Sequence, residues 1–267
     1  MTDQLVTVAI EPPVAFVTLN NPSKRNALSL EMMQTLTDAL RNAGTRPDVA
    51  AIVLAGSGTA FSAGHDLSEM QTIDNETSFD ELFNACVVLM QTIHDVEVPV
   101  IARVHGMATA AGCQLVAACD LAVCNESARF ATPGVNIGLF CSTPMVPLSR
   151  AVGRKRALEM LLTAHPIDAV TALEWGLVNR VVPDDQLDIA VDEFVAAIAR
   201  SSRDVVAIGK RAFWQQIDAT EAGAYAITAP IMATNALHAD AREGIDAFLA
   251  KRPPKWSNSR PPIAATS

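Results

Sequence analysis

The chain has 267 residues, of which 50% are hydrophobic, 18% charged and 5% aromatic, a composition that excludes disordered, fibrous and disulfide-rich proteins. Twenty basic residues against 29 acidic ones give a net charge of −9, the wrong sign for a surface that must neutralise nucleic-acid phosphates. At this length we expect one main domain with an appended or oligomerising segment.

The amino terminus and the cysteines bear on the compartment. Residues 1–20 contain two acidic residues and no basic one, which matches neither a signal peptide nor an Arg-rich transit segment, so we expect a cytoplasmic protein. The apolar runs at 98–104 and 115–123 are interrupted by Arg103 and Asp120, and both are far shorter than the ~20 residues of a membrane span. Five cysteines without a C-x-x-C pair argue against a disulfide framework or a zinc ribbon, and we expect them to be reduced and mostly buried.

Short runs rich in β-branched residues predict strands in the first half of the chain. These runs are Val6–Ile10, Ala15–Leu19, Ala51–Leu54, Val100–Val104 and Leu121–Cys124. Helical periodicity follows the N-cap candidate Ser29 up to Gly44, and a second helical segment is expected over Glu69–His94. This mixture of strands and helices indicates an α/β domain.

From about residue 184 the strand signals fade and helical segments follow. We expect them at Asp184–Arg200, Asp204–Gln216, Glu221–Leu237 and, approximately, Asp240–Lys251. Their faces carry more apolar residues than one thin layer of helices needs, which suggests packing on another subunit. We therefore divide the chain into an α/β core at 1–200 and a helical oligomerisation region at 201–267, ending in a poorly ordered, Pro-rich tail at 252–267.

Several common catalytic motifs do not occur in the sequence. Gly56–Phe61 begins like a dinucleotide fingerprint, but Phe61 stands where the third glycine belongs, and no phosphate-loop motif follows. There is no H-E-x-x-H or G-x-S-x-G motif, and the five histidines lack metal-ligand spacing. We therefore predict neither a metal nor a separate cofactor.

Two segments of small residues remain, each placed after a strand and before a helix. They are Ala60–Leu67 and His105–Leu115. Backbone N–H groups at such turns can converge on one oxygen and stabilise negative charge there, and small residues let a ligand approach the backbone closely. Either turn alone is also consistent with simple packing against a sheet, but the two together favour an oxyanion hole.

Six separated motifs, in order along nearly the whole chain, resemble the crotonase, or enoyl-CoA hydratase/isomerase, family, and most closely its hydratase-domain-containing subgroup. The motifs are Leu19–Leu28, Ala60–Leu67, Val98–Ala102, Ala110–Gln114, Phe130–Pro133 and Glu243–Arg252. The resemblance implies a spiral of β-β-α units with a helical carboxy-terminal region that builds a homotrimer or hexamer. It also implies binding of acyl-CoA thioesters, with coenzyme A as part of the substrate, and stabilisation of a thioester enolate.

The resemblance assigns roles residue by residue. The oxyanion-hole donors would be the backbone N–H groups of His65 and Ala111. The positions that cradle coenzyme A match Lys24, Arg25, Ala27, Ala63, Asp66 and Leu67, and the carboxy-terminal contacts, often made from a neighbouring subunit, match Phe248 and Lys251. Without the resemblance, each of these basic residues would be taken for a solvated surface charge.

The chain departs from the family at the two glutamates with which hydratases move protons to and from water. Their positions match Gln114 and Gly134, and an amide or a bare glycine has no accessible pKa for this work. We therefore predict an acyl-CoA-binding enzyme of fatty-acid metabolism, a lyase or isomerase by family, with weak conventional hydration. A non-catalytic acyl-CoA-binding or regulatory protein is the alternative, and isomerase or thioesterase action also stays open.

Three other side chains near the predicted turns are candidate substitutes for the missing acids, and Cys141 is a candidate nucleophile. The ring of His65 could titrate near neutral pH, or it could point towards coenzyme A or solvent while its N–H alone acts. Asp66 is expected to cap the following helix, and Glu69 to face either the acyl pocket or solvent. Cys141 has no histidine near it in sequence, so we expect a buried residue there rather than a nucleophile.

Overall fold

A computed structural model describes residues 4–257, so the prediction for 258–267 lies outside the described residues. The larger of its two sheets has the strand order β1-β2-β3-β5-β7-β10. Neighbouring strands in it are parallel, except for the antiparallel pair β1 and β2. Its strands are β1 (Val6–Glu11), β2 (Val14–Leu19), β3 (Ala51–Gly56), β5 (Val100–Val104), β7 (Leu121–Asn125) and β10 (Arg180–Val182). The five predicted strands are confirmed, with ends shifted by at most two residues.

The smaller sheet has the order β4-β6-β8-β9. Its strands are β4 (Ala60–Ser62), β6 (Met107–Thr109), β8 (Arg129–Ala131) and β9 (Ile167–Asp168). The units that contain β3-β4, β5-β6 and β7-β8 each place their first strand in the larger sheet and their second in the smaller one, before a helix follows. This repetition confirms the predicted spiral of β-β-α units.

Helices surround the sheets. They are α1 (Leu30–Gly44), α2 (Leu67–Met70), α3 (Glu76–Asp95), α4 (Ala111–Ala118), α5 (Met145–Val152), α6 (Arg154–Thr163), α7 (Ala169–Trp175), α8 (Leu187–Ala199), α9 (Arg203–Gln216), α10 (Glu221–Ala236) and α11 (Ala239–Leu249), with the 3-10 helices η1 (Pro22–Lys24), η2 (Pro133–Ile137) and η3 (Asp184–Gln186). The single helix predicted over Glu69–His94 is wrong. Asn75 interrupts it, because its side chain accepts a hydrogen bond from the Ser78 N–H and so starts α3 as a new helix.

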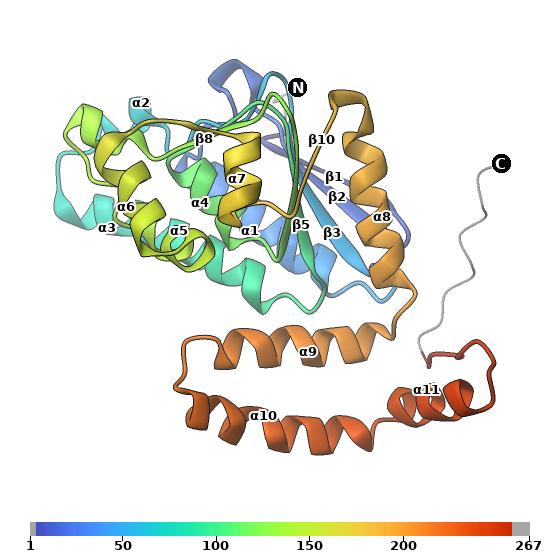
Figure 1. The fold of residues 1–267 in the computed structure, drawn as a ribbon. Helices are drawn as coiled ribbons and strands as arrows, with labels where there is room; N and C mark the ends of the chain where they lie inside the picture. The colour runs from blue at the N-terminus through green and yellow to red at the C-terminus, as the bar shows by residue number, and fades with distance from the viewer. Residues whose placement is uncertain (1–3, 258–267) are drawn as a thin grey trace.

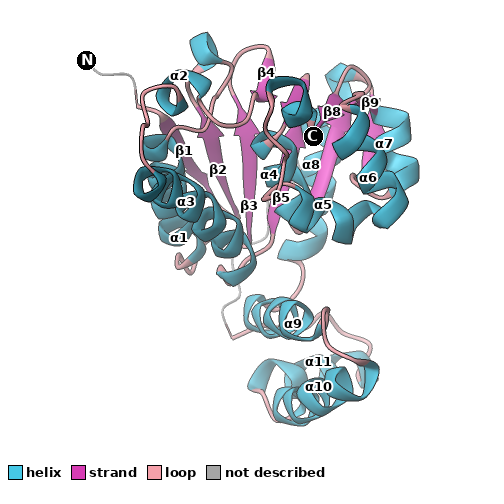
Figure 2. Ribbon diagram, turned by 90° about the vertical axis from the view of Figure 1, so that its left-hand side faces the viewer, coloured by secondary structure: helices cyan, strands magenta, loops and turns pink. Residues whose placement is uncertain are grey.

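The larger sheet is covered on both faces (Figures 1 and 2). Helices α1 and α3 lie over one face, and α8 lies over the other. Successive residues of β3 divide between these layers, because Ile52 and Leu54 join the main core whereas Val53 packs in a second cluster with Leu187 and Val191 of α8. The central strands are therefore buried on both sides, as in other parallel sheets.

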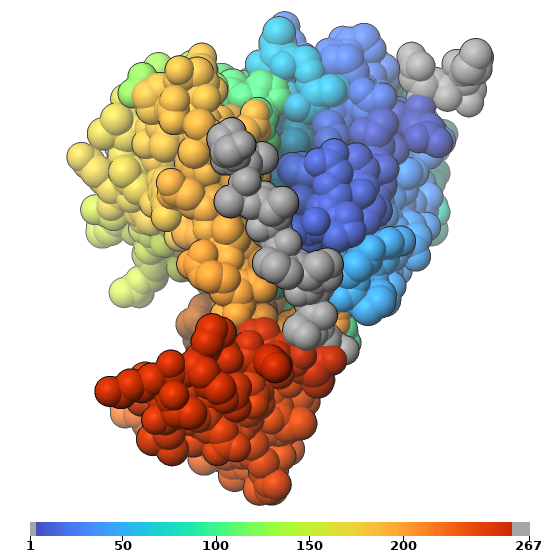
Figure 3. All heavy atoms as spheres, turned by 90° about the vertical axis from the view of Figure 1, so that its right-hand side faces the viewer, coloured from blue at the N-terminus to red at the C-terminus, as the bar shows by residue number. Residues whose placement is uncertain are grey.

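Helices α9, α10 and α11 form a lobe that projects from the core (Figures 1 and 3). Buried Lys210 joins α9 to the core: its ammonium group donates to the carbonyls of Ile93 and Val98 at 2.7 and 2.9 Å and pairs with Asp120 at 2.7 Å. Arg203 adds hydrogen bonds to two carbonyls of the core. The predicted carboxy-terminal helices are thus confirmed, whereas the domain boundary at residue 200 stays a prediction.

The start of the predicted tail contacts this lobe. Trp256 Nε1 donates to the Arg200 carbonyl at 2.8 Å, and the Ser257 N–H donates to Asp240 Oδ1 at 2.7 Å. Residues 252–257 are therefore held by hydrogen bonds. Among the residues that the structure describes, no helix is both long and apolar enough to span a membrane.

Candidate active site

The two small-residue turns lie side by side because β4 and β6 are parallel neighbours, with Ser62 aligned to Ala108. A Cβ added to Gly64 would lie 2.7 Å from the Thr109 carbonyl oxygen and 3.1 Å from the Ala111 nitrogen, so the turns are in direct contact. Gly64 also has a φ of +83°, a conformation that strains any other residue. Glycine is therefore required here on two grounds.

The backbone N–H groups of His65 and Ala111 lie in these two turns and have no hydrogen-bond acceptor among the described residues. Each follows a residue with positive φ, Gly64 at 83° and Ala110 at 52°, and the latter is a strained conformation for alanine. Ala111 is also the first residue of α4, where N–H groups lack partners within the helix and the helix dipole favours negative charge. The arrangement is suited to bind an oxyanion.

Asn26 holds the first turn in place, a role that the sequence alone does not predict. It is fully buried, and its Nδ2 contacts the carbonyl oxygens of Ser57, Ala60 and Phe61 at 2.9, 2.9 and 3.1 Å. Its Oδ1 accepts from the Asn21 N–H at 3.0 Å. One buried amide thus ties the loop at 21–26 to the strand that leads into the turn.

Ser62 and Glu69 complete this support. Ser62 Oγ donates to the Asn26 carbonyl at 2.9 Å and accepts from the Gly64 N–H at 3.2 Å. The Glu69 carboxylate accepts from the Leu30 N–H at 3.0 Å, which places it at the amino end of α1. Glu69 is half-buried, and its carboxylate serves the amino end of α1, a contact that the sequence does not predict.

The residues predicted to cradle coenzyme A form two groups, and the first of them surrounds the turn. Lys24 Nζ lies 2.7 Å from Asp66 Oδ2 and lowers the pKa of that carboxyl, whose other oxygen caps α2 as predicted. The Ala63 N–H donates to the Arg25 carbonyl at 2.9 Å, which brings the loop beside the turn. The neighbouring predicted positions are Ala27, which is buried, and Leu67, which is exposed.

The second group lies on the lobe. Phe248 is 83% exposed near the end of α11, and Lys251 follows that helix with a φ of 53°. Figure 1 shows that α11 lies far from α2, so one chain does not bring these two residues to the turns.

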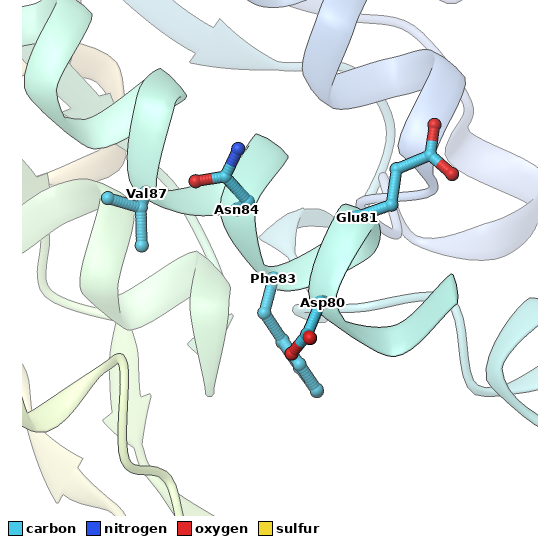
Figure 4. A pocket seen from close by; sticks show the side chains of 5 residues that line it. All are labelled: Asp80, Glu81, Phe83, Asn84 and Val87. Atoms are coloured by element: carbon cyan, nitrogen blue, oxygen red, sulfur yellow. The ribbon is translucent and has the colours of Figure 1, made fainter. Parts of the chain in front are cut away.

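The His65 imidazole packs away from water. It meets Phe83 of α3 edge-on, with ring centroids 5.4 Å apart, and its Nε2 is buried without a hydrogen-bond partner. Burial lowers the pKa of His65 to about 4, so the ring is neutral at physiological pH. This contradicts the hypothesis that the ring titrates near neutral pH. Phe83 also lines a surface hollow on α3 together with Asp80, Glu81, Asn84 and Val87 (Figure 4).

The buried ring makes folding sensitive to acid. Between pH 6.5 and 4 the unfolded chain binds a proton at His65 that the folded chain does not, so stability falls as the pH falls. We expect wild type to lose about 2 kcal/mol more than His65→Phe between pH 7 and pH 5. Urea unfolding of both proteins at the two pH values measures this difference. Equal losses would show that His65 is not buried in its neutral form.

Gln114 lies on α4, three residues after Ala111, and is 3% exposed. Its Oε1 lies 3.6 Å from the Sγ of Cys86 on α3. Burial raises the pKa of the Cys86 thiol to about 12, so the thiol stays protonated. A neutral amide held by a neutral thiol is a poor general base.

Gly134 lies in η2 and leaves no space for a side chain. A Cβ added there would lie 2.3 Å from the Leu139 carbonyl oxygen and 2.9 Å from Cys141 Sγ. The Leu139 N–H donates back to the Gly134 carbonyl at 2.9 Å, which closes the loop on the glycine. Cys141 is buried, as predicted, and burial raises its pKa.

Within residues 4–257 no cluster of three or more histidine, cysteine or acidic side chains could hold a metal ion. All five cysteines are buried and free, as predicted.

Curated relatives and solved structures match over most of the chain. Proteins named "Enoyl-CoA hydratase domain-containing protein 3, mitochondrial" from Xenopus laevis and Homo sapiens are 45% and 46% identical, over 96% and 91% of this chain and 87% and 80% of theirs. An enoyl-CoA hydratase structure from Mycobacterium smegmatis has a TM-score of 0.93 at 47% identity, covering 95% of this chain and 99% of that one. The human domain-containing protein 3 structure has a TM-score of 0.92 at 44% identity, covering 95% and 100%.

The names of the Xenopus and human relatives include the word "mitochondrial", whereas a cytoplasmic location was expected for this chain. The cytoplasmic location expected from residues 1–20 stays a prediction.

The model of the family described as "Enoyl-CoA hydratase/isomerase" matches residues 9–259. Together with the fold, these matches establish that the chain belongs to the enoyl-CoA hydratase/isomerase family, the crotonases.

Proposed function

We propose that this protein binds acyl-CoA thioesters and stabilises negative charge on the thioester oxygen with the N–H groups of His65 and Ala111. One observation carries the proposal: two N–H groups that have no acceptor within residues 4–257 follow positive-φ residues in two turns that touch. Such donors are already oriented before the substrate arrives, and each typically contributes about 3 kcal/mol to the stabilisation of an oxyanion.

The loop with Lys24 and Arg25 supplies positive charge for the phosphates of coenzyme A beside the first turn. The Asp66 carboxylate fixes the Lys24 ammonium group at that position. Phe248 and Lys251 would reach coenzyme A bound to a neighbouring subunit, because the two small-residue turns of their own chain lie far away. A homotrimer, alone or paired into a hexamer, is part of this proposal.

Conventional hydration is expected to be weak, because Gln114 and Gly134 would occupy the positions of the two proton-transferring glutamates. Glu69 is used as a helix cap, and the His65 ring is neutral, with a buried Nε2 that has no hydrogen-bond partner in the part of the chain that the structure describes. This lack of a placed acid or base also favours the second candidate, a non-catalytic acyl-CoA-binding protein.

Two measurements on the purified protein separate these functions. Calorimetric titration with butyryl-CoA and with free coenzyme A tests binding, and we expect the thioester to bind more tightly. Loss of the conjugated absorbance of crotonyl-CoA tests hydration, and we expect it to be slow. Equal affinity for the thioester and free coenzyme A would contradict the proposal, and rapid hydration would contradict its expectation of missing acid-base groups. Turnover of any acyl-CoA would exclude the purely binding role.

A further inference from the structure

The side-chain amide of Gln114 has a hydrogen-bond partner at its oxygen but none, among the described residues, at its nitrogen. Its Oε1 lies 3.6 Å from Cys86 Sγ, and both side chains are buried. A protonated thiol is a donor and an amide oxygen an acceptor, so this contact orients the amide. Its nitrogen meets no acceptor among the described residues and is not a fully enclosed atom. The two N–H bonds of Gln114 are thus available to a ligand.

The free end of this amide lies beside the oxyanion hole. Residues three apart share one face of a helix, and helical side chains lean towards the amino terminus of their helix. Gln114 therefore leans towards the turn of α4 that carries the Ala111 N–H.

Helix α3 contacts both His65 and Gln114. Phe83 and Cys86 are also three residues apart, so the ring that covers His65 and the thiol that holds Gln114 lie on neighbouring turns of one helix face. An acyl group bound with its thioester oxygen at Ala111 would start between the His65 ring and the Gln114 amide.

The side chains in contact with His65 and Gln114 named above are neutral. Burial lowers the pKa of His65 to about 4 and raises that of Cys86 to about 12, so neither carries charge near neutral pH. Phe83 and Gln114 are uncharged at any pH. Burying a carboxylate without a cationic partner costs far more than burying a carbonyl that accepts a hydrogen bond, so a neutral acceptor oxygen fits these surroundings better.

We propose that Cys86 is a positioning residue that fixes Gln114 as a hydrogen-bond donor, so that the site selects acyl-CoA thioesters with a carbonyl oxygen on Cβ. The β-carbonyl is two carbons from the thioester carbonyl, a short distance that suits a donor one helical turn from Ala111. This inference rests on the proposed function and specifies its substrate class as 3-oxoacyl-CoA.

The test compares affinities for acetoacetyl-CoA and butyryl-CoA, which differ by the β-oxygen, in calorimetric titrations. We expect wild type to prefer acetoacetyl-CoA about tenfold, and Gln114→Leu to abolish that preference. Cys86→Ala should lower the preference several-fold, whereas Cys86→Ser should keep most of it because a hydroxyl also donates. Cys124→Ala is the matched control, since it removes another buried thiol, on β7 of the larger sheet, and should leave the preference unchanged.

Three results would overturn the inference. One is equal affinity of wild type for the two thioesters, and another is equal preference in Cys86→Ala and Cys124→Ala. Tighter binding of malonyl-CoA than of acetoacetyl-CoA would show that a carboxylate is preferred instead. If Cys86→Ala does not fold, Gln114→Leu carries the test. Failure of either thioester to bind more tightly than free coenzyme A would overturn the proposed function as well, whereas equal tight binding would overturn only this inference.

Discussion

Replacement of the Ala111 N–H by an ester oxygen, through incorporation of L-lactate at this position, is expected to weaken binding of the acetoacetyl-CoA enolate about 10²- to 10³-fold. The change removes one donor and leaves the side chain and the backbone path of α4 intact. Proline would also remove the N–H, but its ring would approach Gly64, whose added Cβ already lies 3.1 Å from the Ala111 nitrogen. The measurement is a spectroscopic titration of the enolate with each protein.

The matched control is the same ester at Ala117, which removes an ordinary hydrogen bond within the same helix. It should cost about 1 kcal/mol of stability without changing enolate affinity. If the two esters weaken enolate binding equally, the Ala111 N–H is not a donor to the ligand.

The second large effect is expected at Gly134. Gly134→Glu should destabilise the protein by at least about 3 kcal/mol and should not create a hydratase, either alone or with Gln114→Glu. The physical reason is the Leu139 carbonyl oxygen, which would lie 2.3 Å from the new Cβ. Chemical denaturation measures the loss of stability, and crotonyl-CoA absorbance measures hydration.

Gln114→Glu alone separates the steric effect from the chemical one. The new carboxyl has nearly the shape of the amide, but it would be buried beside Cys86, and burial should raise its pKa. We expect a folded protein with little hydration. A stable, active Gly134→Glu variant would show instead that the loop at 134–141 moves aside easily.

Five strands of the larger sheet and the two turns could be predicted because their signals are local, whereas the three-residue edge strand β10 was missed. Val100–Val104 is apolar apart from Arg103 and rich in β-branched residues, and the small residues around Gly64 and Gly112 mark the segments that follow β4 and β6. The strands of the smaller sheet were missed, because β4 and β6 have three residues each and carry no periodicity.

The supports of the site could not be predicted, because they depend on contacts between distant segments. Asn26 holds carbonyls more than 30 positions away, and Glu69 caps a helix that begins 39 residues earlier. The positive φ of Ala110 has no signature in an alanine, and the closure at Gly134 depends on where the Leu139 carbonyl folds back. A resemblance pointed to the two N–H groups, but only the structure shows what holds their turns in place.

The central claim is that two backbone N–H groups stabilise an enolate, and the acidity of bound acetoacetyl-CoA tests it most directly. A pH titration of the near-ultraviolet enolate band, with the thioester saturated by protein and free in solution, gives both ionisation constants. We predict that the pKa of the bound thioester is at least about two units lower, because each donor contributes about 3 kcal/mol to the charged form. An unchanged pKa on tight binding would contradict the account.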